Sequence, residues 1–98
     1  MKIFKSKDIG INLNLGHLNL ASKKFKFNKF LFTKIISDYI CAFECSHNHG
    51  KNDDHLPLKK NFWYWKILKD KKYIDKFKIL EFRNTSIKAI KNNIRLFT

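Results

Sequence analysis

Residues 56–73 of the chain, LPLKKNFWYWKILKDKKY, place four consecutive aromatic residues between groups of lysines and decide the predicted fold. Residues 58–69 and 73–83 are two long runs of β-forming residues with alternating side chains, so we expect each run to form a strand. Residues 69–72, KDKK, are expected to form a polar turn between the two runs. The sequence therefore predicts a long β-hairpin over residues 58–83 with a cationic tip.

Three shorter elements are predicted before this hairpin. Residues 18–22 are expected to form a short strand. Apolar residues at helical spacing then predict a helix that Asn28 caps and that continues to Phe43. Residues 46–55 are polar turn formers and are expected to form a loop.

The segment after the hairpin completes the predicted fold. Residues 84–92 begin with capping residues and predict a short helix, and residues 95–98 are expected to be the stub of a final strand. The order of elements predicts an α+β fold, a ferredoxin-like split βαβ unit with a long β-hairpin extension and a truncated C-terminus. Residues 1–17 are expected to be an N-terminal extension and residues 18–98 a single domain.

The charge of the chain points to a polyanionic partner. Lysine and arginine total 21 against eight acidic residues, which gives a formal net charge of +13. Residues 56–98 hold twelve of these cations and three acids. This concentration favours nucleic acid first and an anionic membrane surface second. No run of about 18 apolar residues is present, so no membrane span is predicted.

The cations of the predicted hairpin are the candidate RNA-binding residues, because lysine side chains neutralise phosphates irrespective of base sequence. They are Lys59, Lys60, Lys66, Lys69, Lys71, Lys72, Lys76, Lys78 and Arg83. Lys69, Lys71 and Lys72 lie at the predicted tip and are expected to approach phosphates most closely. The alternative is a solvated surface that keeps the chain soluble. The neighbouring aromatic residues could stack on bases, but packing is the favoured interpretation for most of them.

A group of cysteines and histidines contains possible metal ligands: Cys41, Cys45, His47, His49 and His55. Two thiols four residues apart, with histidines just beyond, make a zinc site sterically possible, but the spacing matches no established zinc motif. The favoured alternative is a helix end with buried cysteines and solvated histidines, in which Cys41 faces the core. We therefore expect no metal and no cofactor.

No catalytic arrangement is identified in the sequence. Nucleophilic catalysis by a Cys/His pair would also need an oxyanion hole, which no motif supplies. With three glycines, the chain contains neither a P-loop nor a dinucleotide-binding motif. We therefore predict that the protein is not an enzyme and has no small-molecule substrate.

The composition also bears on the origin of the gene. Lysine, asparagine, isoleucine and phenylalanine supply 51 of the 98 residues, and valine is absent. These four residues have the most AT-rich codons, so the gene is expected to be AT-rich. A mitochondrial genome explains this bias and the lack of an arginine-rich presequence. An AT-rich parasite or bacterial genome is the alternative source.

Short segments of the chain resemble the family of the universal small-subunit ribosomal protein ten, which includes NusE. Residues 18–20 and 33–36 are similar in spacing to the family's first strand and its Lys-Lys-Ile-Val helix. Residues 56–59 resemble its Pro-Leu-Pro-Thr-Lys start of the hairpin, and residues 80–84 resemble Phe-Glu-Ile-Arg-Thr on its return strand. The chain departs from the family at residues 85–87, Thr-Ser-Ile, where the family has His-Lys-Arg.

The resemblance implies a structural protein in the head of the small ribosomal subunit, here of the mitochondrial ribosome. Its hairpin would contact small-subunit rRNA and neighbouring head proteins. The alternative hypothesis is a small basic accessory subunit of a mitochondrial respiratory membrane complex, held in place by protein contacts.

Overall fold

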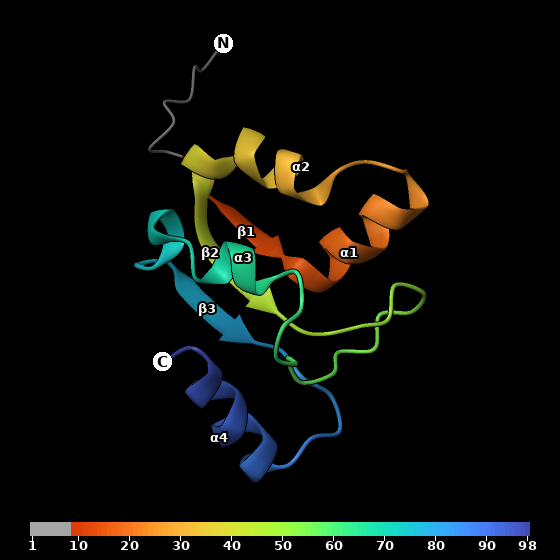
Figure 1. Ribbon diagram of the computed structural model, residues 1–98, viewed down its shortest axis with the longest axis vertical. Helices are drawn as coiled ribbons and strands as arrows, with labels where there is room; N and C mark the ends of the chain where they lie inside the picture. The colour runs from red at the N-terminus through yellow and green to blue at the C-terminus, as the bar shows by residue number, and fades with distance from the viewer. Residues whose placement is uncertain (1–8) are drawn as a thin grey trace.

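The computed structural model describes residues 9–98, which form a small α+β domain with a three-stranded sheet (Figure 1). Its helices and strands are, in chain order, β1 (Ile11–Asn14), α1 (Leu15–Lys24), α2 (Lys29–Ile35), β2 (Ile40–Cys45), α3 (Trp65–Leu68), β3 (Phe77–Leu80) and α4 (Ile87–Leu96). Two 3-10 turns, Ser37–Tyr39 and Lys71–Tyr73, precede β2 and β3. None of the helices in the described range is long and apolar enough to cross a membrane.

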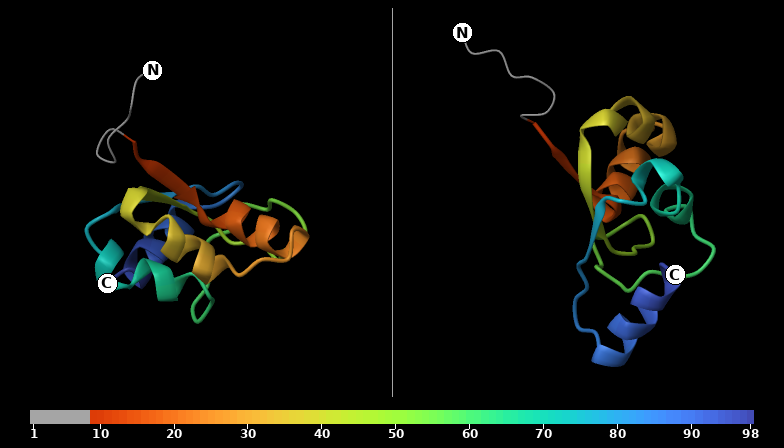
Figure 2. Two further views of the ribbon diagram at one scale, coloured as in Figure 1. Left: turned by 90° about the horizontal axis from the view of Figure 1, so that it is seen from above. Right: turned by 90° about the vertical axis from the view of Figure 1, so that its left-hand side faces the viewer.

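The sheet has the strand order β1-β2-β3, and both pairs of neighbours are parallel. Leu13 is paired with Phe43, and Phe43 with Lys78. Parallel strands need a crossover connection, and the chain supplies it through α1 and α2 for the first pair and through α3 for the second. These three helices lie on one side of the sheet, and α4 lies beyond the C-terminal end of β3 (Figures 1 and 2).

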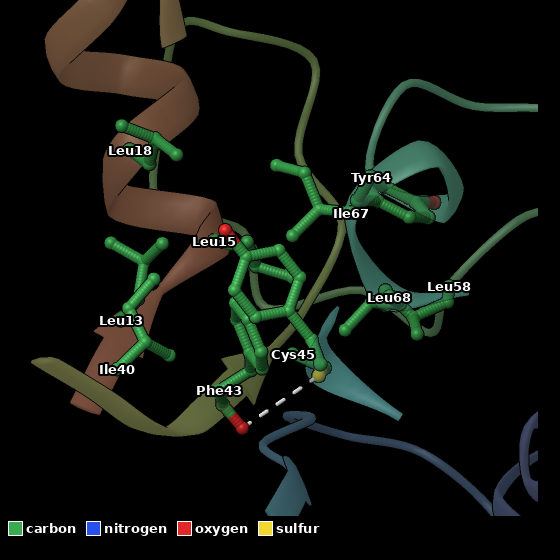
Figure 3. Packing of buried hydrophobic residues seen from close by; sticks show 11 residues of the cluster. Leu13, Leu15, Leu18, Ile40, Phe43, Cys45, Leu58, Tyr64, Ile67 and Leu68 are labelled. Atoms are coloured by element: carbon green, nitrogen blue, oxygen red, sulfur yellow. Dashed lines mark hydrogen bonds between the residues drawn. The ribbon is translucent and has the colours of Figure 1, made fainter. Parts of the chain in front are cut away.

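The hydrophobic core lies between the sheet and these helices (Figure 3). Its buried residues are Leu13, Leu15, Leu18, Ile40, Phe43, Cys45, Leu58, Tyr64, Ile67, Leu68 and Tyr73. Phe43 of the central strand is completely buried and meets the Tyr73 ring edge-on, with 5.3 Å between the ring centroids. Burial of a side chain of this size contributes roughly 1.5–3 kcal/mol. The core therefore attaches the α3 region to the central strand.

The predicted strand over residues 18–22 is wrong, because these residues belong to α1. Asn14 caps this helix by accepting a hydrogen bond of 3.0 Å from the backbone N–H of His17. The buried positions are then residues 15, 18, 19 and 22, which is helical spacing. Because β1 and the first turn of α1 fall within residues 1–17, the predicted extension does not reach residue 17. Residues 1–8 lie outside the described part of the chain.

The predicted cap at Asn28 is confirmed, but the helix that follows is shorter than expected. The Asn28 side chain accepts hydrogen bonds from the backbone N–H groups of Phe30 and Leu31, at 2.9 and 3.1 Å. The helix ends at Ile35, and Ile40–Cys45 is the central strand instead of the last helical turns. Ile40–Cys45 is a short, largely apolar run, and periodicity alone does not distinguish such a run from a segment of a buried helix.

The predicted hairpin over residues 58–83 is not formed. Trp65–Leu68 is a helical turn, and β3 pairs in parallel with β2 rather than antiparallel with residues 58–69. Tyr64, Ile67 and Leu68 are buried at positions i, i+3 and i+4, so the apolar side chains follow a helical period. Packing of these three side chains in the core is the reason why this aromatic stretch turns into a helix.

The C-terminal helix is confirmed, with different bounds. Ser86 caps α4 by accepting a hydrogen bond of 3.1 Å from the backbone N–H of Ala89. The helix continues to Leu96, so the predicted strand stub at residues 95–98 is wrong. Asn93 is buried, and its side-chain oxygen accepts a hydrogen bond of 2.6 Å from the backbone N–H of Leu58. This contact holds α4 against the segment that precedes α3.

Candidate functional site

The predicted RNA-binding residues lie on several elements rather than along one hairpin. Around α3, Lys59 and Lys60 precede the helix, Lys66 lies on it and Lys69 follows it. Lys71 and Lys72 are in the 3-10 turn that comes next. Around β3, Lys76 precedes the strand, Lys78 lies on it and Arg83 follows it. All of them are exposed except Lys76 and Lys78, which are half-buried. The cations are therefore presented to solvent, but in smaller groups than a hairpin would give.

One group of cations lies near Trp65 at the start of α3. Lys60, Lys69 and Arg95 line a depression of about 350 Å³ together with this half-buried indole. The ammonium of Lys69 is 5.1 Å from the centroid of the Trp65 ring, within cation–π distance. The indole N–H donates a hydrogen bond of 2.8 Å to the carbonyl of Lys59. Three cations thus line the same depression as an aromatic ring whose N–H is hydrogen-bonded to the backbone. We call these four residues the Trp65 depression.

The end of α4 completes the Trp65 depression. Phe97 packs edge-on against Trp65, with 5.1 Å between the ring centroids. The same helix carries Arg95 to the rim of the depression. Arg95 is not among the predicted binding residues, because those are the cations of the predicted hairpin and Arg95 lies outside it. The helical period of α4 is the signal that could have placed it beside the aromatic stretch.

An apolar groove continues from the Trp65 depression between β3 and α4. It has a volume of about 570 Å³, and Lys69 and Thr98 line both hollows. Lys78 lines the groove, but its ammonium donates to the carbonyls of Tyr73 and Ile74. Burial lowers the pKa of Lys78 below its usual value. Lys78 is therefore occupied by backbone acceptors and is a weaker candidate for phosphate contact than predicted.

The predicted cationic tip is a turn packed against the 3-10 turn that precedes β2. Lys72 donates hydrogen bonds to the hydroxyl of Ser37, at 2.8 Å, and to the carboxylate of Asp38, at 3.2 Å. This ion pair is exposed and contributes little to stability. Lys71 is exposed in the same turn. Lys72 therefore lies against the segment between α2 and β2 rather than at the free tip of a hairpin.

The expectation that the aromatic stretch serves mainly for packing is confirmed for its centre. Tyr64 is 1% exposed, and its hydroxyl accepts a hydrogen bond of 2.8 Å from the backbone N–H of Lys59. The same hydroxyl lies 3.0 Å from Nδ1 of His47. Burial raises the pKa of Tyr64 to about 12. Trp63 is half-buried against Phe30, whereas Phe62 is exposed.

The structure does not gather the cysteines and the loop histidines that were considered as metal ligands. Cys41 is exposed, contrary to the prediction that it faces the core, because it is the extra residue where the register between β1 and β2 shifts. Cys45 is fully buried, and burial raises its pKa to about 12, which disfavours the thiolate that binds metal. His47 is also buried, and its burial lowers its pKa.

His55 instead belongs to a different cluster, with His17 and Asp53. The ligand atoms of these three residues all lie within 4.8 Å of one another. A hydrogen bond from Nδ1 to the carbonyl of Glu81 raises the pKa of His55. Burial raises the pKa of Asp53, but its contacts with the two histidines outweigh this effect, so the net pKa is lowered. The sequence did not indicate this cluster, because 36 residues separate His17 from Asp53.

Of these features, the Trp65 depression combines the two kinds of group that bind single-stranded nucleic acid. Cations neutralise the phosphate backbone, and an aromatic ring offers a surface on which a base can stack. Comparisons of the chain with protein-family models, with curated protein sequences and with solved structures give no match.

Proposed function

We propose that the chain is a non-catalytic RNA-binding protein, a structural component of the small ribosomal subunit in the mitochondrion. The observation that carries this proposal is the convergence of Lys60, Lys69 and Arg95 on Trp65. Each cation that contacts a phosphate releases condensed counterions, which favours binding and makes it sensitive to salt. A base stacked on the indole would add roughly 1–3 kcal/mol.

The distribution of charge supports a polyanionic partner over a merely solvated surface. Residues 56–98 contain twelve cations and three acids. Within the described residues, two of these cations form ion pairs with carboxylates, Lys72 with Asp38 and Lys76 with Asp75. Most of the positive charge in this region therefore has no carboxylate within 4 Å and repels its neighbours. An approaching phosphate backbone relieves that repulsion.

The assignment to the ribosome is supported by the resemblance of residues 56–59 and 80–84 to the ribosomal family and does not depend on a hairpin. The two segments flank the α3–β3 region that carries the cations. Lys59 lies in the first segment and Arg83 in the second, and both are exposed. In this proposal, rRNA contacts the cations of the region, and neighbouring head proteins contact the remaining surface.

The alternative function is that of a basic accessory subunit of a mitochondrial respiratory membrane complex. One feature favours it: Phe77 and Ile79 of β3 are 78% and 47% exposed. β3 is an edge strand, and exposed apolar side chains on such a strand suit a contact with another protein. A ribosomal neighbour could equally cover these side chains, so this feature does not outweigh the charge distribution.

Fractionation of mitochondria from the native host separates the two functions. We expect the chain to sediment with small ribosomal subunits in a sucrose gradient, and to be released by high salt or ribonuclease. Migration with a respiratory complex after mild detergent extraction, without any ribosomal fraction, would support the alternative. A variant with Lys60→Glu, Lys69→Glu and Arg95→Glu should no longer be found in the gradient fractions that contain small subunits. The control, with Lys23→Glu, Lys24→Glu and Lys26→Glu at the exposed end of α1, should remain in it.

A further inference from the structure

One side chain of α1 meets two side chains of the loop that follows β2. Nε2 of His17 is 2.8 Å from Oδ2 of Asp53, and Nε2 of His55 is 3.0 Å from the same oxygen. His17 is in the first turn of α1, whereas Asp53 and His55 belong to the loop. Figure 1 shows α1 and this loop side by side. Two imidazole nitrogens therefore face one carboxylate oxygen.

His55 is held firmly in this arrangement. It is 5% exposed, and its Nδ1 lies 2.9 Å from the carbonyl oxygen of Glu81. Its own carbonyl accepts a hydrogen bond of 2.9 Å from the backbone N–H of Arg83. The backbone of His55 has φ of 51°, a left-handed conformation that few non-glycine residues adopt. A strained backbone that the surrounding contacts maintain is a feature of functional sites.

The hydrogen bond to Glu81 determines which nitrogen of His55 is available. A carbonyl oxygen accepts only, so Nδ1 must carry the hydrogen. In the neutral imidazole, Nε2 then has a lone pair and faces the carboxylate of Asp53, which also only accepts. Two acceptors at 3.0 Å need a cation or a proton between them. A histidine whose other N–H donates to a backbone carbonyl is the usual arrangement of a metal ligand.

Asp53 supplies a second, independent indication. Its Oδ2 faces both histidines, but its Oδ1 is buried and has no hydrogen-bond partner among the described residues. A buried carboxylate oxygen without a partner is costly. A divalent cation bound to this carboxylate would offset the cost through its charge.

We propose that Nε2 of His17, Nε2 of His55 and Oδ2 of Asp53 bind a zinc ion, with water as the fourth ligand. Two imidazoles and one carboxylate suit zinc, whereas magnesium and calcium prefer sites made of oxygen ligands. Zinc–ligand bonds of about 2.0–2.1 Å in a tetrahedron place neighbouring ligand atoms about 3.3 Å apart. The site must therefore open by a few tenths of an ångström. The His17 side chain is 58% exposed, so it can make this adjustment and leaves a path for the ion.

The zinc ion would connect three segments of the chain. His17 fixes α1, Asp53 and His55 fix the loop, and the hydrogen bond from His55 to Glu81 reaches the segment after β3. Because the unfolded chain does not hold these ligands together, zinc binding would stabilise the folded state. This inference is independent of RNA binding, since none of the three ligands belongs to the Trp65 depression.

Titration of the purified full-length chain tests the zinc site. The chain is stripped with a chelator, and zinc chloride is added in a calorimeter while thermal unfolding is followed in parallel. The test variants are His17→Gln and Asp53→Asn. The matched control is His49→Gln, an exposed histidine of the same loop that lies outside the cluster. Because the His17 side chain is largely exposed, its replacement should leave the circular dichroism unchanged.

We expect one zinc ion per chain for the wild type and for His49→Gln, with a rise in Tm on zinc addition. His17→Gln and Asp53→Asn should bind at least about tenfold more weakly and lose the rise in Tm. Cobalt bound to the wild type should show the visible absorption of a four-coordinate ion. The proposal is overturned if the wild type binds no zinc, which leaves a metal-free imidazole–carboxylate network. It is also overturned if His17→Gln binds as tightly as the wild type, or if His49→Gln loses zinc equally.

Discussion

The indole N–H of Trp65 donates a hydrogen bond of 2.8 Å to the carbonyl of Lys59, which orients the ring beside the basic surface. The Phe97 ring also packs edge-on against the indole, at 5.1 Å between centroids. A ring of fixed orientation loses little entropy when a base stacks on it. This relationship distinguishes Trp65 from its neighbour Tyr64, which is buried in the core.

Replacement of Trp65 by leucine should weaken the binding of single-stranded RNA by roughly 1–3 kcal/mol, because a stacking surface is lost. The slope of the logarithm of the association constant against the logarithm of salt concentration should not change, because no cation is removed. Fluorescence anisotropy of a labelled RNA at several salt concentrations measures both quantities. Trp63→Leu is the control, since Trp63 packs against Phe30 and Lys29. Equal losses in the two variants would exclude Trp65 as a stacking residue.

Replacement of Asn93 by alanine should destabilise the protein by about 1–3 kcal/mol. The buried side chain of Asn93 accepts a hydrogen bond from the backbone N–H of Leu58. Removal of this side chain leaves the Leu58 N–H without a partner. The neighbouring Asn92 is exposed, so Asn92→Ala should change the free energy of unfolding by less than about 0.5 kcal/mol. Urea unfolding of the two variants checks the difference. Similar midpoints would mean that α4 is not held by this contact.

The two cysteines should react with iodoacetamide at very different rates. Cys41 is exposed, whereas Cys45 is buried and has a pKa raised to about 12. Only the thiolate is nucleophilic, so at pH 8 Cys45 remains protonated as well as inaccessible. Mass spectrometry of the folded chain should show one modification, at Cys41, and two after addition of urea. Rapid modification of both thiols without denaturant would contradict the position of β2 in the core.

Replacement of Tyr64 by phenylalanine should cost about 1–3 kcal/mol, although the ring itself is preserved. The hydroxyl contacts the backbone N–H of Lys59 and Nδ1 of His47, and both groups would lose their partner. His47 is 2% exposed, so water does not easily replace the hydroxyl. Thermal unfolding measures the loss, and Tyr39→Phe, at an exposed tyrosine, serves as the control. A loss no larger than that of the control would show that these buried groups find other partners.

Local signals predicted some elements of the fold, and contacts between distant residues decided the others. The cap at Asn28 and the loop over residues 46–55 follow from short-range chemistry, and both are observed. Leu15, Leu18, Asn19 and Ser22 have helical spacing in the sequence, but the prediction of a short strand over residues 18–22 does not take account of it. No local signal shows that residues 40–45 pair with β1 and β3, since that pairing joins segments that lie far apart in the sequence.

The candidate sites were predictable to the extent that they depend on composition. The concentration of lysines after residue 56 indicated the basic surface before any fold was known. The grouping of Lys60 and Lys69 with Arg95 requires α4 to pack beside α3, which the sequence did not indicate. The cluster around Asp53 depends on the crossover that brings α1 to the loop. Only the fold determines these distances.

The central claim is that the Trp65 depression binds RNA, and the salt dependence of binding tests it most directly. The measurement is the affinity of the purified chain for small-subunit rRNA across a series of salt concentrations. A variant with Lys60→Gln, Lys69→Gln and Arg95→Gln should bind more weakly. Its plot of the logarithm of the association constant against the logarithm of salt concentration should be less steep, by about 0.7–0.9 for each lost phosphate contact. The control, with Lys23→Gln, Lys24→Gln and Lys26→Gln, should keep the wild-type slope. A wild-type slope in the first variant, with a reduced slope in the control, would contradict the claim.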